Sequence, residues 1–357
     1  FTGLALDADG NVYVAALLQG NGTPIVYGPG VASVVGDAFG NILVLRLEAA
    51  DGAVSWAKQW GGTSVDAPTA LAVSGDSVFV VGRTSSNPST FGARTIASAT
   101  GNGFVVRASR QTGDVSEVKH VPGTVDLAGL AVNGTSIAVV GSARNSLQLD
   151  ASCAVNPSGV GSDGMVLDLA ASSLTCQWSR SFGDTVANND AHVTAVAALP
   201  GAGWSIGGQF EGAILLGVSA LVSAGDNDAF VARYAGDGQH RWSYRYGGTL
   251  GESTRGVAVT PEGNVIVAGS FTDAITLGSH PLSGQRDVFV TRMSSGSTPT
   301  HEWAVSLGGS DQDLAASVAI GLDGSVYVLS TFTGMTSVGA HVFASQAIDS
   351  WLAALVR

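Results

Sequence analysis

The sequence predicts an all-β protein, a single β-propeller of six blades with about four antiparallel strands in each blade. A unit of about 60 residues repeats along the chain, which indicates a modular array. Each unit holds short β-branched or aromatic runs between turn residues, a composition typical of strands. No segment shows the spacing of an amphipathic helix. A period this long without helices fits a propeller blade better than a leucine-rich, ankyrin or β-helix repeat.

The first strand expected in each unit is a triplet with alanine at its centre. We assign it to the innermost strand of the blade, because neighbouring blades converge there and only a small side chain keeps the spacing. The six alanines are Ala5, Ala72, Ala131, Ala197, Ala258 and Ala319.

Second and third strands follow each triplet. Turns such as Asp9-Gly10 and Asp323-Gly324 precede the second strand, and these residues tolerate positive φ. The second strands are expected at 12–14, 78–80, 137–139, 204–206, 265–267 and 326–328, and the third at 41–47, 104–107, 163–169, 228–234, 287–293 and 349–356.

A fourth strand, often containing tryptophan and ending on glycine, closes five of the units. We place it at the outer edge of the blade, where a large ring covers the gap to the next blade. The tryptophans are Trp56, Trp178, Trp242 and Trp303, and the second unit has 115–121 in their place. The resulting blades are 1–62, 63–123, 124–183, 184–248, 249–309 and 310–357.

The sixth unit has no fourth strand in this sequence. We expect Phe1 to be a processed or truncated end, with upstream residues supplying the strand that completes the last blade. Two alternatives stay open: seven blades in the full-length protein, and an open-ended solenoid of repeats.

Two stretches resemble a known repeat. Residues 228–234, followed by Gly238, Trp242 and 246–248, look like the bacterial SBBP-type β-propeller repeat, and residues 256–269 do so as well. The resemblance extends over nearly the whole chain. It implies a module of large secreted or surface-anchored bacterial proteins, and the repeat carries no catalytic residue to transfer.

The charge balance is acidic, with 16 basic and 28 acidic residues and a net charge of −12. This balance argues against a nucleic-acid partner, because phosphates need a basic surface. No apolar stretch is long enough to cross a bilayer. We expect an exported bacterial protein at the cell surface or outside the cell, where any membrane anchor, such as a lipidated cysteine, would lie upstream of this sequence.

The only two cysteines, Cys153 and Cys176, fall in the third unit. A disulfide would fasten the long loop of that unit and would stabilise it by about 3 kcal/mol. An even pair within one module favours an oxidising compartment. The other reading is a pair of buried, unreactive thiols.

One loop offers oxygen ligands in the order that calcium prefers. Asp7, Asp9 and Asn11 alternate around Gly10, as at the start of a calcium loop. The bidentate glutamate is missing, since Leu18 occupies the corresponding position, so a turn capped by Asp7 competes with the calcium site. Residues 226–228 and 311–313 hold acids in a similar spacing.

Other motifs do not support a cofactor site. Residues 159–164 match the glycine pattern of dinucleotide-binding proteins, but a strand is expected after them where that site needs a helix. The histidines lack partners at metal-ligand spacing; they are His120, His192, His240, His280, His301 and His341. We therefore expect neither a cofactor nor a catalytic residue.

Two functions from different classes remain. The first is a non-catalytic scaffold or binding module that contacts a protein, or a surface glycan, through loops and the channel mouth, in a larger surface assembly. The second is a propeller that binds or degrades carbohydrate with convergent carboxylates. The variable loops at 17–37, 85–102, 142–162 and 212–226 are poor in acids, histidine and arginine, which favours the first, and the shortage of exposed aromatics favours a protein partner over a glycan.

Overall fold

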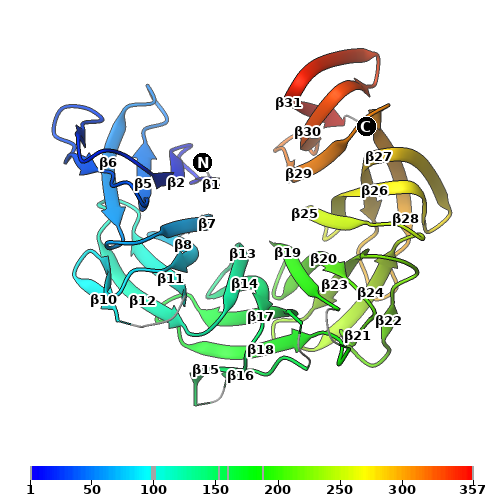
Figure 1. Ribbon diagram of the computed structural model, residues 1–357, viewed down its shortest axis with the longest axis horizontal. Helices are drawn as coiled ribbons and strands as arrows, with labels where there is room; N and C mark the ends of the chain where they lie inside the picture. Colours follow the sequence, from blue (N-terminus) through cyan, green and yellow to red (C-terminus); the bar gives the residue numbers. More distant parts are fainter. Residues whose placement is uncertain (1, 98–101, 152, 159–160, 187–188, 356–357) are drawn as a thin grey trace. The chain divides into compact units, whose positions relative to one another are not determined.

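The computed structural model describes residues 2–97, 102–151, 153–158, 161–186 and 189–355 (Figure 1). All regular elements in these ranges are strands, and none of the described residues is helical. Most strands form four-stranded antiparallel sheets in chain order, which confirms the predicted all-β, β-propeller class. Two compact units make up the chain, residues 1–156 with 166–179 and residues 157–165 with 180–357.

Three four-stranded sheets follow one another over residues 3–182. The first is β1 (Gly3–Leu6), β2 (Val12–Leu18), β5 (Asn41–Leu47) and β6 (Val54–Trp60). The second is β7 (Asp66–Ser74), β8 (Ser77–Thr84), β11 (Asn102–Ser109) and β12 (Val115–Val121). The third is β13 (Val125–Asn133), β14 (Ser136–Ala143), β17 (Asp163–Ala170) and β18 (Cys176–Phe182).

The fourth sheet is β19 (Ala191–Ala198), β20 (Trp204–Phe210), β23 (Asp228–Tyr234) and β24 (His240–Tyr246). The remaining strands form one seven-stranded sheet in the order β25-β26-β27-β28-β30-β29, with β31 paired to β30. These strands are β25 (Ser253–Val259), β26 (Val265–Leu277), β27 (His280–Met293), β28 (His301–Gly309), β29 (Asp313–Ile320), β30 (Val326–Val338) and β31 (His341–Leu355).

Short hairpins occupy the variable stretches between second and third strands. They are β3 (Pro24–Ile25) with β4 (Val34–Val35), β9 (Ser89–Phe91) with β10 (Arg94–Ile96), β15 (Leu147–Asp150) with β16 (Cys153–Val155), and β21 (Ala213–Ile214) with β22 (Leu221–Val222). In the fifth and sixth units the two strands themselves continue into the hairpin. The turns at Gly278 and Gly339 allow this, because both glycines have positive φ, +63° and +60°.

The first strands of neighbouring sheets lie side by side within each unit. β7 lies between β1 and β13, and β25 lies between β19 and β29. The alanines of the triplets are on these strands; five are half-buried and Ala319 is exposed. A β-bulge precedes the alanine in the last five first strands, as between Val193 and Ala195. Bulges at the same place in these five modules give their inner strands a similar local twist.

Tryptophans of the fourth strands pack onto the following sheet. Trp56 and Trp60 join Val78, Val80 and Phe104 in one buried cluster. Trp242 packs in a buried cluster with residues of β25, β26 and β27, and Trp303 packs in another with residues of β29, β30 and β31. Trp178, on β18, is half-buried. Trp56, Trp242 and Trp303 therefore each fill the boundary between their own module and the next.

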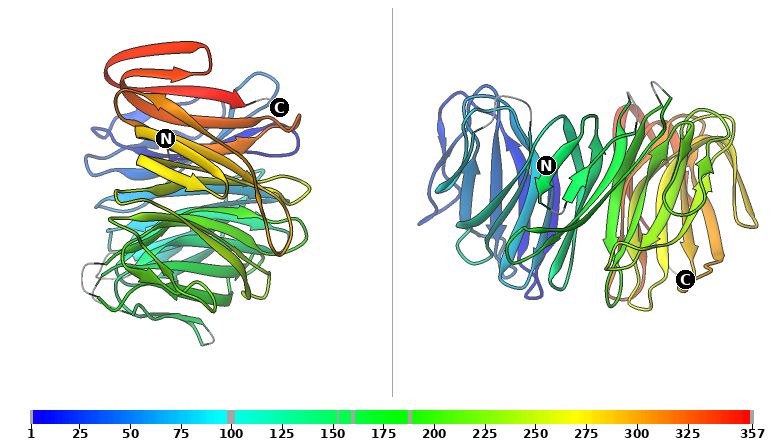
Figure 2. Two further views of the ribbon diagram at one scale, coloured as in Figure 1. Left: turned by 90° about the vertical axis from the view of Figure 1, so that its right-hand side faces the viewer. Right: turned by 90° about the horizontal axis from the view of Figure 1, so that it is seen from below.

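The sixth unit contributes three strands, β29, β30 and β31, as the sequence predicts. β28 also pairs with β30 through Gly308 and Gly309, which is why the fifth and sixth units share one sheet. β31 pairs with β30 on one side, and no other strand of the described residues pairs with it. Figure 2 shows β31, in red, at this edge of the sheet.

Candidate functional site

Glycine pairs at the ends of fourth strands lie directly over acids at the starts of third strands. A Cβ placed on Gly247 would collide with the carboxylate of Asp228, and one on Gly308 would collide with Asp287. In the third sheet a single glycine, Gly183, lies over Asp163 in the same way. The first glycine of each pair is needed because no side chain fits above the buried acid.

A second acid accepts a hydrogen bond from the other glycine of the pair. The Gly62 N–H donates to the Asp66 carboxylate at 2.7 Å, and the Gly248 N–H donates to Glu252 at 2.8 Å. The Gly309 N–H donates to Asp313 at 3.0 Å. Sequence reasoning missed Asp66 and Glu252, and it singled out Asp313 only as a possible cation ligand. The signal was present, because an acid follows the glycine pair four residues later in all three cases.

These buried acids have local structural partners. Asp66 accepts hydrogen bonds from the hydroxyls of Thr84 and Ser86, the latter at 2.6 Å. Asp228 forms an ion pair with Arg245 and accepts the Ala224 N–H at 3.1 Å. Burial raises the pKa of Asp228, which the hydrogen bond from Arg245 only partly offsets. Their repetition at equivalent positions identifies a structural role.

Glu252 borders a hollow with a largely polar lining in the second unit. The hollow has a volume of 470 Å³, and its lining includes Asp226, Arg255, Arg286 and Thr272. The Glu252 side chain is buried and accepts the Gly248 and Thr272 N–H groups. Burial raises its pKa to about 7, more than these two hydrogen bonds lower it. Glu252 therefore titrates near neutral pH.

This pKa predicts a loss of stability between pH 4.5 and 7. The folded state holds the Glu252 proton up to about pH 7, whereas the unfolded chain releases it near 4.5. The folded state thus binds more protons in this window, so the free energy of unfolding falls as pH rises. Each pKa unit corresponds to about 1.4 kcal/mol, which limits the loss to about 3 kcal/mol.

The Glu252→Gln variant tests this expectation. The amide cannot ionise but keeps an oxygen for the Gly248 N–H. We expect denaturant midpoints of the variant to change less than those of the wild type from pH 4.5 to 8, and to exceed them at pH 8. Identical pH profiles for both proteins would rule out Glu252 as the titrating group.

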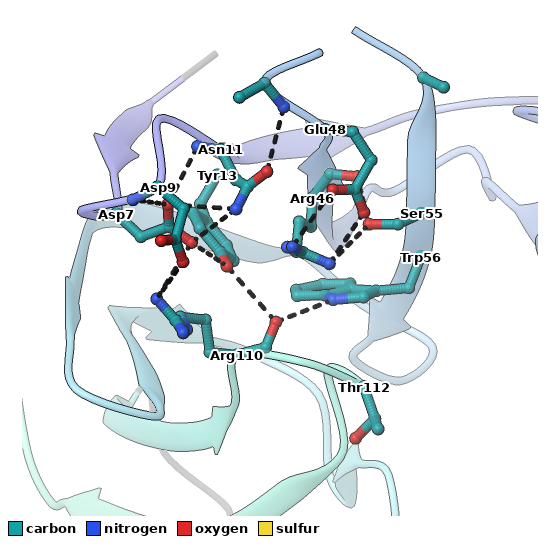
Figure 3. A network of polar contacts seen from close by, with 12 residues as sticks. Asp7, Asp9, Asn11, Tyr13, Arg46, Glu48, Ser55, Trp56, Arg110 and Thr112 are labelled. Atoms are coloured by element: carbon teal, nitrogen blue, oxygen red, sulfur yellow. Dashed lines mark hydrogen bonds and ion pairs between the residues drawn. The ribbon is translucent and has the colours of Figure 1, made fainter. Parts of the chain in front are cut away.

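The calcium candidates Asp7, Asp9 and Asn11 lie in a hydrogen-bond network (Figure 3). Asp7 Oδ1 accepts the N–H groups of Asp9 and Asn11, each at 3.0 Å. Asp7 Oδ2 accepts the Tyr13 hydroxyl at 3.0 Å and lies 3.3 Å from Arg110 Nη1. Asp9 Oδ2 lies 3.4 Å from the same Arg110 nitrogen. Both carboxylates therefore already have protein donors.

This network joins the first sheet to the second. The Arg110 carbonyl accepts the Trp56 indole N–H at 3.1 Å, and its guanidinium contacts Asp7 (Figure 3). Burial by itself raises the pKa of Asp7, but hydrogen bonds from Asn11, Tyr13 and Asp9 outweigh it and lower the pKa to about 2. Asp7 stays ionised and holds the turn that precedes β2.

The other acidic candidates also lie among protein groups. Asp228 pairs with Arg245, and Asp313 accepts the Gly309 N–H, while Asp311 accepts the Ser310 hydroxyl at 3.0 Å. Within the described residues, no three His, Cys, Asp or Glu side chains are grouped so as to hold a metal ion. The calcium site stays a prediction from the sequence.

The glycine motif at 159–164 lies partly outside the described residues, since Gly159 and Val160 are among those not described. Its last two residues begin β17, a strand. In the described part of the chain, no helix is long and apolar enough to cross a membrane.

Cys153 and Cys176 form the predicted disulfide, with their Cα atoms 6.1 Å apart. The bond joins the β15–β16 hairpin to the start of β18. Asp150 supports the same junction, because its Oδ2 accepts the Cys176 N–H at 2.7 Å and its other oxygen pairs with Lys119.

Two neighbouring hollows of 590 and 580 Å³ lie along β31. Both are lined by Val305 of β28 and by Ala354 and Leu355 of β31, so they adjoin each other and are together called here the β31 groove. Trp303 borders the first hollow and Trp351 the second. No motif of the sequence pointed to this groove, because its lining residues meet only through packing of β28 against β31.

Comparison with known proteins does not assign this chain to a family. No family model matches the sequence, and no curated protein matches it. Among solved structures the chain is similar to one described as "Structure of Dos1 propeller", with 9% identity and a TM-score of 0.41. That similarity covers 96% of this chain and 80% of the other.

Proposed function

We propose that this chain is a non-catalytic binding module that engages protein partners. The β31 groove carries the proposal, because its hollows of 590 and 580 Å³ are bordered by apolar side chains that include Trp303 and Trp351. Binding sites are typically concave and partly apolar.

The roles of the buried acids support a non-catalytic reading. Three of these acids accept a hydrogen bond from the N–H of a glycine at the end of a fourth strand; they are Asp66, Glu252 and Asp313. Asp7 forms an ion pair with Arg110. A hydrolase needs carboxylates that face a substrate and differ from module to module, whereas these acids repeat one structural contact.

We propose that the protein acts outside the cell. The Cys153–Cys176 disulfide suits an oxidising compartment, which supports export. The resemblance of residues 228–248 to the SBBP-type repeat supports a bacterial cell-surface or secreted protein, in which this module would belong to a larger surface assembly.

A polysaccharide-binding or polysaccharide-degrading propeller is the second candidate. The hollow beside Glu252 favours it, since a glutamic acid with a pKa of about 7 suits general acid catalysis and Asp226 borders the same hollow. Hydrolysis of any member of a polysaccharide panel by the wild type, lost in Glu252→Gln, would support this candidate and contradict the first.

The proposed function is tested by presenting the immobilised chain to a displayed random-peptide library and to a glycan array. We expect enriched peptides that bind the purified chain in solution and no saturable glycan binding. Binding confined to the glycan array would overturn the proposal. This screen samples the whole surface, so its outcome does not depend on which part of the chain contacts the peptide.

A further inference from the structure

The polar hollow beside Glu252 lies inside the second compact unit. Its lining residues fall between Gln209 on β20 and Leu314 on β29, so the hollow does not depend on the ends of the chain. They differ from the residues that line the β31 groove. With a volume of 470 Å³, the hollow is large enough for a side chain or a small molecule. It is therefore a separate candidate site.

Arg255 lines this hollow from a β-bulge that recurs in the modules. The bulge of β25 lies between Thr254 and Gly256, so Arg255 is the extra residue. The residue at the same bulge is small in the other units, where it is Thr69, Ala128, Thr194 and Ala316. Arg255 is exposed, and bulges often re-aim a side chain beside a functional site. The fold of the module therefore does not require this arginine.

Arg286 is a second departure from the repeat in the same unit. It is exposed, lines the hollow and directly precedes Asp287, the buried acid of β27. The residues that precede the corresponding third-strand positions are uncharged; they are Gly40, Ser162, Asn227 and Ile348. Within the described ranges, neither Arg255 nor Arg286 forms an ion pair. Two guanidinium groups thus border one hollow with no carboxylate at ion-pair distance.

The charges of the lining suit a singly charged anion. Arg255 and Arg286 supply two positive charges and Asp226 supplies one negative charge, while Glu252 is neutral when protonated. Two positive charges and one negative charge leave about one positive charge, which a carboxylate balances and a doubly charged phosphate exceeds. The guanidinium fork also matches the two oxygens of a carboxylate.

The rest of the lining favours a protein side chain over a sugar. Leu250 and Leu314 border the hollow, and their apolar surface suits the methylene groups of a glutamate. None of the described lining residues is aromatic, whereas sugar rings usually pack against aromatic faces.

We propose that this hollow binds a glutamate side chain of a partner protein, whose carboxylate is held by Arg255, Arg286 and the carboxyl group of Glu252. Protonated Glu252 donates a hydrogen bond to the bound carboxylate, whereas ionised Glu252 repels it. This inference rests on the proposed protein-binding function and adds a contact outside the β31 groove.

Peptides that differ in one group provide the probe. The pentapeptide Gly-Ser-Glu-Ser-Gly, with both ends capped, is titrated into the ¹⁵N-labelled full chain at pH 6, and NMR shifts report binding. We expect saturable shifts that include the side-chain N–H signals of Arg255 and Arg286. The same peptide with glutamine in place of glutamate should bind at least about tenfold more weakly, because it has no charge.

The pH dependence of peptide binding tests the contact with Glu252. With a pKa of about 7, the neutral fraction of Glu252 falls about tenfold from pH 6 to pH 8, and peptide affinity should fall by the same factor. The peptide glutamate stays ionised over this range. Glu252→Gln should remove most of the dependence. The other charged groups around Glu252 are Asp226, Asp228, Arg245, Arg255 and Arg286, and the variant keeps all of them.

The repeat itself suggests protein variants that preserve the fold. Arg255→Thr and Arg286→Asn introduce the residues that the fourth unit has at these positions, Thr194 and Asn227. We expect each to lose peptide affinity about tenfold or more. Arg241→Gln removes an exposed arginine of β24 outside the hollow and should bind as the wild type does. Circular dichroism and thermal melting check that all variants fold.

Four results would overturn the inference. They are equal binding of the glutamine peptide, wild-type affinity in both arginine variants, the same pH dependence in Glu252→Gln as in the wild type, and tighter binding of galacturonate than of the peptide. The last would make an acidic sugar the occupant. If the glutamate peptide does not bind but the library screen enriches other peptides, this site is rejected and the protein-binding function stands.

Discussion

Replacing Trp242 with alanine should lower the free energy of unfolding by about 3–5 kcal/mol, the range for large aromatic residues removed from a core. Trp242 is 6% exposed and belongs to the buried cluster with Val257, Val267 and Phe289. Its ring also contacts Tyr244 edge-on, with centroids 5.7 Å apart. The substitution leaves a cavity at the boundary between the fourth sheet and the following strands.

Urea unfolding followed by circular dichroism measures this effect as a shift of the midpoint. Val218→Ala is a suitable control, because Val218 is 98% exposed and should change stability by less than about 0.5 kcal/mol. A Trp242→Ala variant that is destabilised by less than about 1 kcal/mol would show that the repeated tryptophan does not seal the modules.

Removing the disulfide should destabilise the third sheet by about 3 kcal/mol. The bond closes a loop with a sequence separation of 23 and ties β16 to β18. In the chain-entropy account, this cross-link limits the unfolded chain more than the folded one. We expect the double variant Cys153→Ser/Cys176→Ser to unfold at a lower urea concentration than the oxidised wild type.

A reducing agent supplies the matched comparison. Dithiothreitol should lower the midpoint of the wild type to that of the double variant and leave the double variant unchanged. Equal midpoints for oxidised wild type and double variant would mean that the Asp150 contacts with Lys119 and Cys176 hold this junction without the disulfide.

Much of the strand order was predictable because the modules repeat. The runs expected at 41–47 and 228–234 coincide with β5 and β23. Turn residues and β-branched runs indicate turns and strands locally, and the same pattern in six units makes each assignment more secure. The long hairpins of β26–β27 and β30–β31 were not predicted, since the stretches before Asp287 and Asp349 vary in sequence and read as loops. Their turns at Gly278 and Gly339 are the local signal that distinguishes them.

The candidate site was less predictable, for a physical reason. The β31 groove is lined by Val305 and Ala354, which lie far apart in the sequence and meet only through sheet register and packing. The burial of Glu252, and hence its pKa, likewise depends on Gly248 and Thr272 closing around it. The calcium loop shows the converse, since Asp7 and Asp9 have the spacing of ligands and the structure gives them Arg110 as a partner.

Hydrogen exchange along β31 tests most directly whether the last unit has an open edge. β27 is the reference, because it is a third strand paired on both sides. We predict that alternate amides of residues 350–355 exchange much faster than those of residues 288–293. Equal protection of the two strands would contradict an open edge at β31.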